Sequence, residues 1–113
     1  KLGLPFDNDV DVLLTRGENG WGSSKASRRS HVSEKHRVIM MFGDNLNDFF
    51  DLPDKANYVT RKDSVLKHEN MWGSKWFMLA NPVYGHWEQS IYGFELLDEE
   101  SKTKAKLENI RTN

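Results

Sequence analysis

The stretch Arg37-Val-Ile-Met-Met-Phe-Gly-Asp-Asn-Leu-Asn-Asp-Phe-Phe50 decides the fold that this sequence predicts. Its apolar part, residues 38–42, is short, rich in branched and aromatic side chains, and ends at Gly43. Runs of this kind are typical of strands that are buried on both faces of a parallel sheet. Two carboxylates, Asp44 and Asp48, follow directly. Because ligands of open α/β sheets bind beyond the carboxyl ends of the strands, this turn is the first candidate site.

Length and composition indicate a part of an ordinary globular protein. The chain has 113 residues, of which 37% are hydrophobic and 29% charged, enough for one small domain. The net charge of −1 gives no basic surface for a nucleic acid polymer, and no apolar stretch approaches the roughly 20 residues that span a bilayer. Cysteine is absent, which excludes disulfides and cysteine zinc sites and leaves the compartment open. The sequence does not indicate an oligomeric state.

The order of elements predicts an α/β domain. We expect strands at residues 10–16, 38–42 and 76–80, helices at 26–36 and 63–72, and one or two further helices interrupted near Gly93. Alternation of strands and helices favours parallel pairing of the two apolar strands. In the C-terminal segment we expect four apolar side chains to pack: Leu96, Leu97, Leu107 and Ile110.

The N-terminal acidic run matches a calcium loop only faintly. Asp7-Asn-Asp-Val-Asp11 is followed by Glu18, but Val12 stands where that loop requires glycine. A solvated acidic turn is the favoured interpretation.

One lysine and two carboxylates are the residues that suggest chemistry. Lys25 follows Ser23 and Ser24, either of which can cap the helix at 26–36, and a cation at a helix N-terminus favours an anion such as phosphate. A solvated basic helix is the alternative. Asp44 and Asp48 stand four apart on one turn and offer the oxygen ligands that suit Mg²⁺ bridged to phosphate. A turn that merely caps the next helix is the structural alternative.

Two motifs then carry a resemblance to a known family. Gly43-Asp-Asn-Leu-Asn-Asp-Phe49 and, further along, Trp76-Phe-Met-Leu-Ala-Asn-Pro-Val-Tyr-Gly-His-Trp-Glu88 together resemble the class C acid phosphatases. These are the bacterial lipoprotein 5′-nucleotidase branch of the haloacid dehalogenase superfamily, and the resemblance covers residues 2–92. It implies a Rossmann-like fold with a mainly parallel sheet flanked by helices. It also implies magnesium as cofactor, phosphate monoesters of nucleotides or aromatic alcohols as substrates, and a periplasmic, outer-membrane or secreted location.

The resemblance also implies roles for individual residues. Asp44 matches a direct magnesium ligand, Asp48 a residue that supports it, and Lys25 the lysine that steadies nucleophile and phosphate. Tyr84 looks like the family aromatic that stacks on the base or ring of the substrate, whereas its position after Pro82 equally permits a loop aromatic that closes the core. We interpret the neighbouring histidine, residue 86, as a surface residue.

The first motif of the family is not identifiable. That motif is a strand ending in Asp-x-Asp, which supplies the aspartate nucleophile, and Asp7-Asn-Asp9 follows no apolar strand. We therefore expect residues 1–113 to be the C-terminal portion of a single haloacid dehalogenase-type domain, with the nucleophile upstream and an unpaired apolar edge at residues 38–42. Such a fragment is expected to be inactive alone. The alternatives are a non-catalytic module that binds phosphate or nucleotide, and a structural fragment.

Overall fold

The computed structural model describes residues 12–111. The chain divides into two compact units, Lys1–Val38 and Ile39–Asn113, which we describe separately. The strand expected at residues 10–16 is wrong for residues 12–16, which form a loop and the start of a turn, while residues 10 and 11 lie outside the described part. The acidic run at 7–11 also lies outside it, so its interpretation as a solvated turn stays a prediction. The assignment of residues 1–113 to one domain stays a prediction as well.

The first unit contains one α-helix within the described residues. A short 3-10 turn, η1 (Glu18–Gly20), precedes the helix α1 (Ala26–Lys35), which confirms the helix predicted there. The ring of Trp21 packs edge-on against His31 with centroids 5.2 Å apart. This contact ties the turn segment to the middle of the helix.

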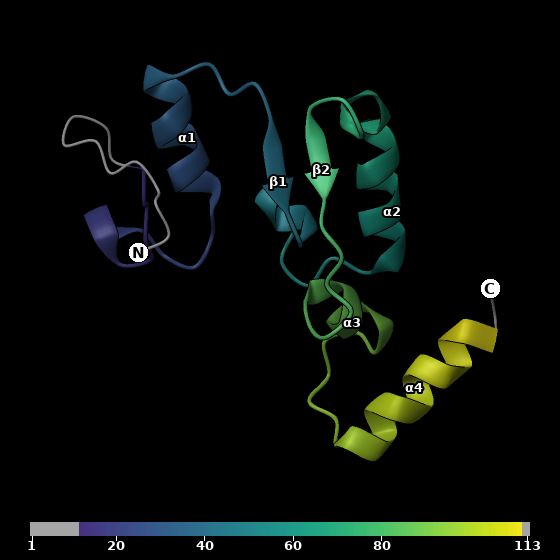
Figure 1. The fold of residues 1–113 in the computed structure, drawn as a ribbon. Helices are drawn as coiled ribbons and strands as arrows, with labels where there is room; N and C mark the ends of the chain where they lie inside the picture. The colour runs from purple at the N-terminus through teal and green to yellow at the C-terminus, as the bar shows by residue number, and fades with distance from the viewer. Residues whose placement is uncertain (1–11, 112–113) are drawn as a thin grey trace. The chain divides into compact units, whose positions relative to one another are not determined.

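A parallel pair of strands forms the centre of the second unit. β1 (Met41–Gly43) and β2 (Trp76–Met78) pair with Met41 opposite Trp76, and α2 (Tyr58–Lys67) belongs to the crossover between them (Figure 1). The predicted α/β class and the parallel pairing are confirmed. Both strands are shorter than predicted. Two backbone hydrogen bonds flank the pairing. Met41 N donates to the carbonyl of Lys75 at one end, and Leu79 N donates to the carbonyl of Gly43 at the other.

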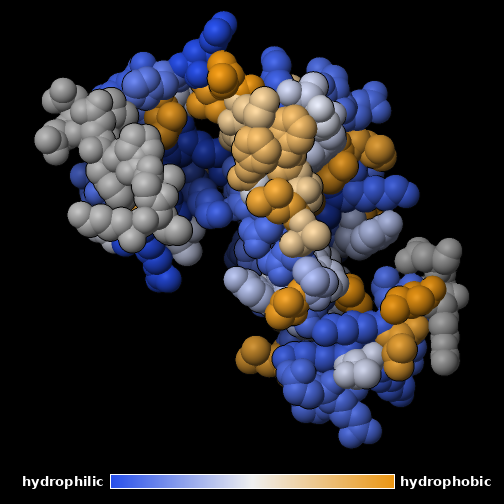
Figure 2. Space-filling view, in the orientation of Figure 1, coloured by the Kyte–Doolittle hydropathy of each residue, from blue (hydrophilic) through white to orange (hydrophobic). Residues whose placement is uncertain are grey.

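The expectation that residues 38–42 are buried on both faces is wrong for this chain. Val38, Ile39 and Met40 are 42%, 68% and 46% exposed, and Phe42 is 61% exposed while its ring stacks on Phe77 at 5.1 Å. Figure 2 shows apolar side chains gathered over the two strands. The physical reason is that β1 pairs with β2 alone among the described strands, so its other edge has no neighbour to cover these side chains.

The core of the second unit is a cluster of aromatic rings. Trp76 of β2 lies at its centre and is 9% exposed, with the rings of Phe49, Phe50, His68 and Trp72 around it at centroid distances of 5.2 to 5.7 Å. Phe49 itself is 3% exposed. The cluster anchors the segment that follows the candidate turn, because two of its rings come directly after that turn.

Helix α2 starts earlier than the sequence predicted. The prediction was 63–72, whereas the helix runs over Tyr58–Lys67 and a 3-10 turn, η3 (Glu69–Met71), follows it. The side chain of Asn57 caps the helix by accepting a hydrogen bond from Thr60 N at 3.0 Å. The N-cap of α2 was the signal that the sequence interpretation missed.

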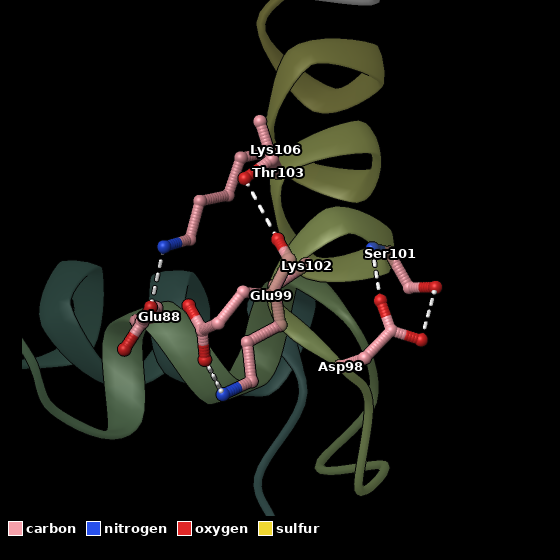
Figure 3. A network of polar contacts seen from close by, with 7 residues as sticks. All are labelled: Glu88, Asp98, Glu99, Ser101, Lys102, Thr103 and Lys106. Atoms are coloured by element: carbon pink, nitrogen blue, oxygen red, sulfur yellow. Dashed lines mark hydrogen bonds and ion pairs between the residues drawn. The ribbon is translucent and has the colours of Figure 1, made fainter.

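Two further helices complete the second unit. α3 (His86–Ile91) and α4 (Glu99–Arg111) are separated around Gly93, as predicted, and Lys106 of α4 forms an ion pair with Glu88 of α3 at 2.5 Å (Figure 3). The predicted packing of three leucine and isoleucine side chains is wrong. α4 contacts α3 through this polar pair, which leaves the apolar residues open; the exposed fractions are 104% for Leu96, 51% for Leu107 and 74% for Ile110. Leu97 is half-buried.

None of the helices within residues 12–111 has the length and apolar character that a membrane span requires.

Candidate functional site

The turn after β1 is built around the carboxylate of Asp48. Its Oδ2 accepts hydrogen bonds from the backbone N–H groups of Asp44 at 3.0 Å and Asn45 at 3.1 Å. The Oδ1 of Asn45 accepts a hydrogen bond from the backbone N–H of Asn47 at 3.3 Å, and a capping box starts the 3-10 turn η2 (Leu46–Asp48). Asp48 therefore holds the backbone from which the Asp44 side chain projects.

Gly43 is required for this turn because there is no room for a side chain. A Cβ atom on Gly43 would lie 2.4 Å from the Cβ and 2.6 Å from the Oδ2 of Asp48. The close approach of Asp48 to the end of β1 thus depends on glycine at this position.

Asp44 is linked to the end of the neighbouring strand. Its Oδ2 accepts a hydrogen bond from Asn81 Nδ2 at 2.8 Å. The Oδ1 of Asn81 accepts from the backbone N–H groups of Val83 at 3.3 Å and Tyr84 at 3.4 Å. One asparagine thereby connects the carboxyl ends of both strands and shapes the loop that carries Tyr84.

The donor set at this turn fits one side of a magnesium site. Mg²⁺ keeps several waters and takes one or two protein carboxylates. Asp44 is exposed, and its hydrogen bond with Asn81 uses Oδ2 and does not involve Oδ1. The same residues contain no cluster of three or more histidine, cysteine, aspartate or glutamate side chains. Asp44 therefore offers one oxygen ligand, and a metal there would take its other ligands from water or from elsewhere.

Lys25 belongs to the first unit and is described within that unit alone. It is exposed and stands at the N-terminus of α1, where its carbonyl accepts from Arg29 N at 2.9 Å. Ser24 Oγ accepts from Ala26 N at 3.2 Å, but the N-cap residue of α1 is Lys25 and no side chain caps the helix, so the prediction of a serine cap is wrong. Arg28 donates to the carbonyls of residues 22–24 at 3.3 to 3.5 Å and holds the preceding loop. The joint action of Lys25 with the carboxylate turn stays a prediction.

Tyr84 does not close the core. Its side chain is 68% exposed, so the interpretation of a loop aromatic packed under Pro82 is wrong. The backbone of Tyr84 is fixed by Asn81, and the ring stands open to solvent. Its role as the stacking aromatic stays a prediction. His86 is exposed, as interpreted.

Sequence reasoning missed two residues next to this turn. Asn81 ends an apolar run and precedes a proline, which is a signal for a side chain that bonds to the following backbone. Arg61 of α2 is 7% exposed, and burial lowers the pKa of its guanidinium. It lines the same pocket as Asp44 and Asn81. Its signal was its position three residues after Tyr58 and four before Val65, on one helical face.

Comparison with known proteins identifies the family. The family model for the haloacid dehalogenase superfamily, subfamily IIIB (acid phosphatase), matches residues 3–87. The fold is similar to the class C acid phosphatase from Bacillus anthracis, with 31% identity and a TM-score of 0.67 over 76% of this chain. A second structure of the class C acid phosphatase from this organism, with tungstate bound, gives 32% identity and a TM-score of 0.66 over the same share. The chain covers 36% of each of those chains.

This chain belongs to the haloacid dehalogenase superfamily, subfamily IIIB, the acid phosphatases. The resemblance stated from the two motifs is thereby confirmed, and so is the fold class, an α/β arrangement with a parallel sheet flanked by helices.

Proposed function

We propose that the protein containing this chain is a metal-dependent acid phosphatase that hydrolyses small phosphate monoesters. The observation that carries the proposal is the Asp44–Asn81 pair, which sets an exposed carboxylate at the carboxyl ends of two parallel strands. Family membership supports the reaction class. The Bacillus anthracis structure with tungstate supports an oxyanion as guest, because tungstate is a tetrahedral oxyanion like phosphate.

Each candidate residue has a role in this proposal. Asp44 would hold the metal, which we take to be Mg²⁺, while Asp48 and Asn81 keep the backbone and the carboxylate of Asp44 in place. A bound divalent cation supplies charge neutralisation at the phosphate. Lys25 adds a positive charge for the same anion. Tyr84 offers an open aromatic face on which a nucleobase or an aromatic leaving group stacks.

The reaction also requires a nucleophile that none of these residues provides. We propose that an aspartate from a part of the protein outside this sequence attacks phosphorus, so that the ester oxygen leaves and an aspartyl-phosphate forms. Water then releases inorganic phosphate. We further propose nucleoside 5′-monophosphates as a substrate class and a location outside the cytoplasm.

Assays on the full-length protein test this proposal. We expect turnover of p-nitrophenyl phosphate and of nucleoside 5′-monophosphates at acidic pH, loss of turnover with a chelator, and recovery with Mg²⁺. The 113-residue chain alone is expected to show none. Saturable nucleotide binding without any turnover by the full-length protein would favour a non-catalytic binding module instead. Absence of both would favour a structural fragment.

A further inference from the structure

A large apolar pocket opens in the second unit beside the candidate turn. Its volume is about 840 Å³, and its walls come from the candidate turn (residues 44–46), α2, the end of β2 with the loop that follows it, and α3, with one residue of α4. Aromatic and aliphatic side chains make up most of the lining, among them Tyr58, Leu66, Leu79 and Ile91. A volume of this size and a mainly apolar lining are typical of sites for small organic molecules.

The pocket contains a largely buried arginine that has no ion-pair partner among the described residues, although the carboxylate of Asp44 lines the same pocket. Arg61 is 7% exposed and lines the pocket, and within residues 12–111 no hydrogen bond or ion pair reaches its guanidinium. Arginine is almost never buried unless it is paired, because an isolated charge loses its hydration. The guanidinium nitrogens of Arg61 are not among the fully buried, unpartnered side-chain atoms of the described residues, so they can donate to an anion that enters this pocket.

A second unused donor lies in the same lining. The Nε1 of Trp87 is buried, and the described residues provide no acceptor for it. Buried indole N–H groups normally have a partner. Gly85 leaves room for this ring, because a Cβ on Gly85 would lie 3.1 Å from Trp87 Cδ1. A guanidinium among mainly apolar walls defines the chemistry of a guest: acceptor oxygens on an apolar body.

We propose that this pocket binds an amphipathic organic anion, such as an aromatic carboxylate, with its oxygens on Arg61 and its apolar body against Tyr58 and Leu66. Trp87 lines the same pocket, so its indole signal reports a guest that binds there. Inorganic phosphate alone is a poor guest because it leaves the apolar walls uncovered. The inference gives a role to Arg61, to which the proposed hydrolysis assigns none, and the pocket shares Asp44 and Asn81 with the proposed metal site.

Ligand binding to the unaltered protein provides the first test. We would titrate 1-naphthylacetate, its neutral isostere 2-(1-naphthyl)ethanol, and inorganic phosphate, and follow the ¹⁵N-labelled indole signal of Trp87, assigned with Trp87→Phe. The account predicts that naphthylacetate binds about 10- to 100-fold more tightly than the alcohol and shifts the Trp87 signal. Equal affinity for acid and alcohol, or no shift of the Trp87 signal with any ligand, would overturn the proposal.

Variants then test whether Arg61 is the charge that makes the pocket prefer the acid over the alcohol. Arg61→Met is expected to abolish the preference for the acid over the alcohol, and Arg61→Lys to retain a weaker preference. Lys67→Met is the matched control, because it removes an exposed cation of the same helix that does not line the pocket. If Arg61→Met keeps the full preference, the assignment is wrong. If that variant does not fold, the comparison of Arg61→Lys with Lys67→Met decides, and equal affinities in the two would contradict the proposal.

Discussion

Asp44 Oδ2 and Asn81 Nδ2 lie 2.8 Å apart and are separated by 37 positions in the sequence. This hydrogen bond joins the ends of β1 and β2 and uses one oxygen of the carboxylate. The other oxygen stays available on an exposed side chain, which is the arrangement that a metal ligand needs. The same asparagine fixes the backbone of Tyr84.

Replacement of Asn81 by alanine is expected to weaken metal binding. Without the Nδ2 donor the carboxylate of Asp44 loses its fixed orientation, and residues 83 and 84 lose their acceptor. Loss of such a supporting partner typically costs about 10- to 100-fold in metal affinity or activity. Titration of Mg²⁺ against the rate of the full-length protein measures the change. Asn70→Ala, on the exposed turn η3, is the control and should behave as wild type.

Gly43→Ala is expected to destabilise the second unit by about 1–3 kcal/mol, as overpacking does. The added methyl would lie 2.4 Å from Asp48 Cβ and push that residue away from the backbone N–H groups it binds. Gly22→Ala is the matched control, since nothing lies within 4 Å of a Cβ there. Denaturant unfolding of both variants measures the difference. Equal stability of Gly43→Ala and wild type would show that the turn yields without cost.

Arg61→Met is expected to raise the stability of the unliganded protein by about 1 kcal/mol. Methionine keeps much of the apolar volume and removes a largely buried charge that has no ion-pair partner in residues 12–111. Thermal unfolding without added anions measures the effect, with the exposed Arg37→Met as control. A loss of stability by more than about 3 kcal/mol would indicate a guanidinium that is paired in the protein.

Helix α4 is expected to lose order at low pH through Asp98. The backbone N–H of Ser101 donates to Asp98 Oδ1 at 2.8 Å and holds the pKa of that carboxyl below its usual range (Figure 3). Because the folded-state pKa is depressed, the stabilisation is complete above the unfolded-state value near ~3.9 and disappears as pH falls through the folded-state value. The ¹³Cα shifts of residues 100–104 report the change. Asp98→Asn retains an acceptor and should remove the pH dependence.

The sequence predicted those helices, strands and breaks that are decided by neighbouring residues. The helix at 26–35, the parallel strands and the break near Gly93 follow from periodicity and punctuation. The start of α2 was missed because a single cap, Asn57, decided it. The expectation that residues 38–42 are buried was wrong because burial on both faces needs strands on both sides. Among the described strands, only β2 pairs with β1.

In the candidate site, too, features set by neighbouring residues could be predicted, and features set by residues far apart in the sequence could not. The turn carboxylates could be named from their spacing alone, since Asp48 binds the backbone of Asp44 within one short segment. The Asn81 bond joins residues far apart in sequence, and the burial of Arg61 arises from the packing of several elements. Neither relationship exists in any local window of sequence.

The role of Asp44 is tested most directly by Asp44→Asn in the full-length protein, with Asp63→Asn, an exposed aspartate of α2, as control. Magnesium-dependent hydrolysis of p-nitrophenyl phosphate is the measurement. The account predicts that kcat/KM falls by at least about 100-fold in Asp44→Asn and stays at the wild-type value in Asp63→Asn. Wild-type, magnesium-dependent turnover by Asp44→Asn would contradict the assignment of this carboxylate as the metal ligand.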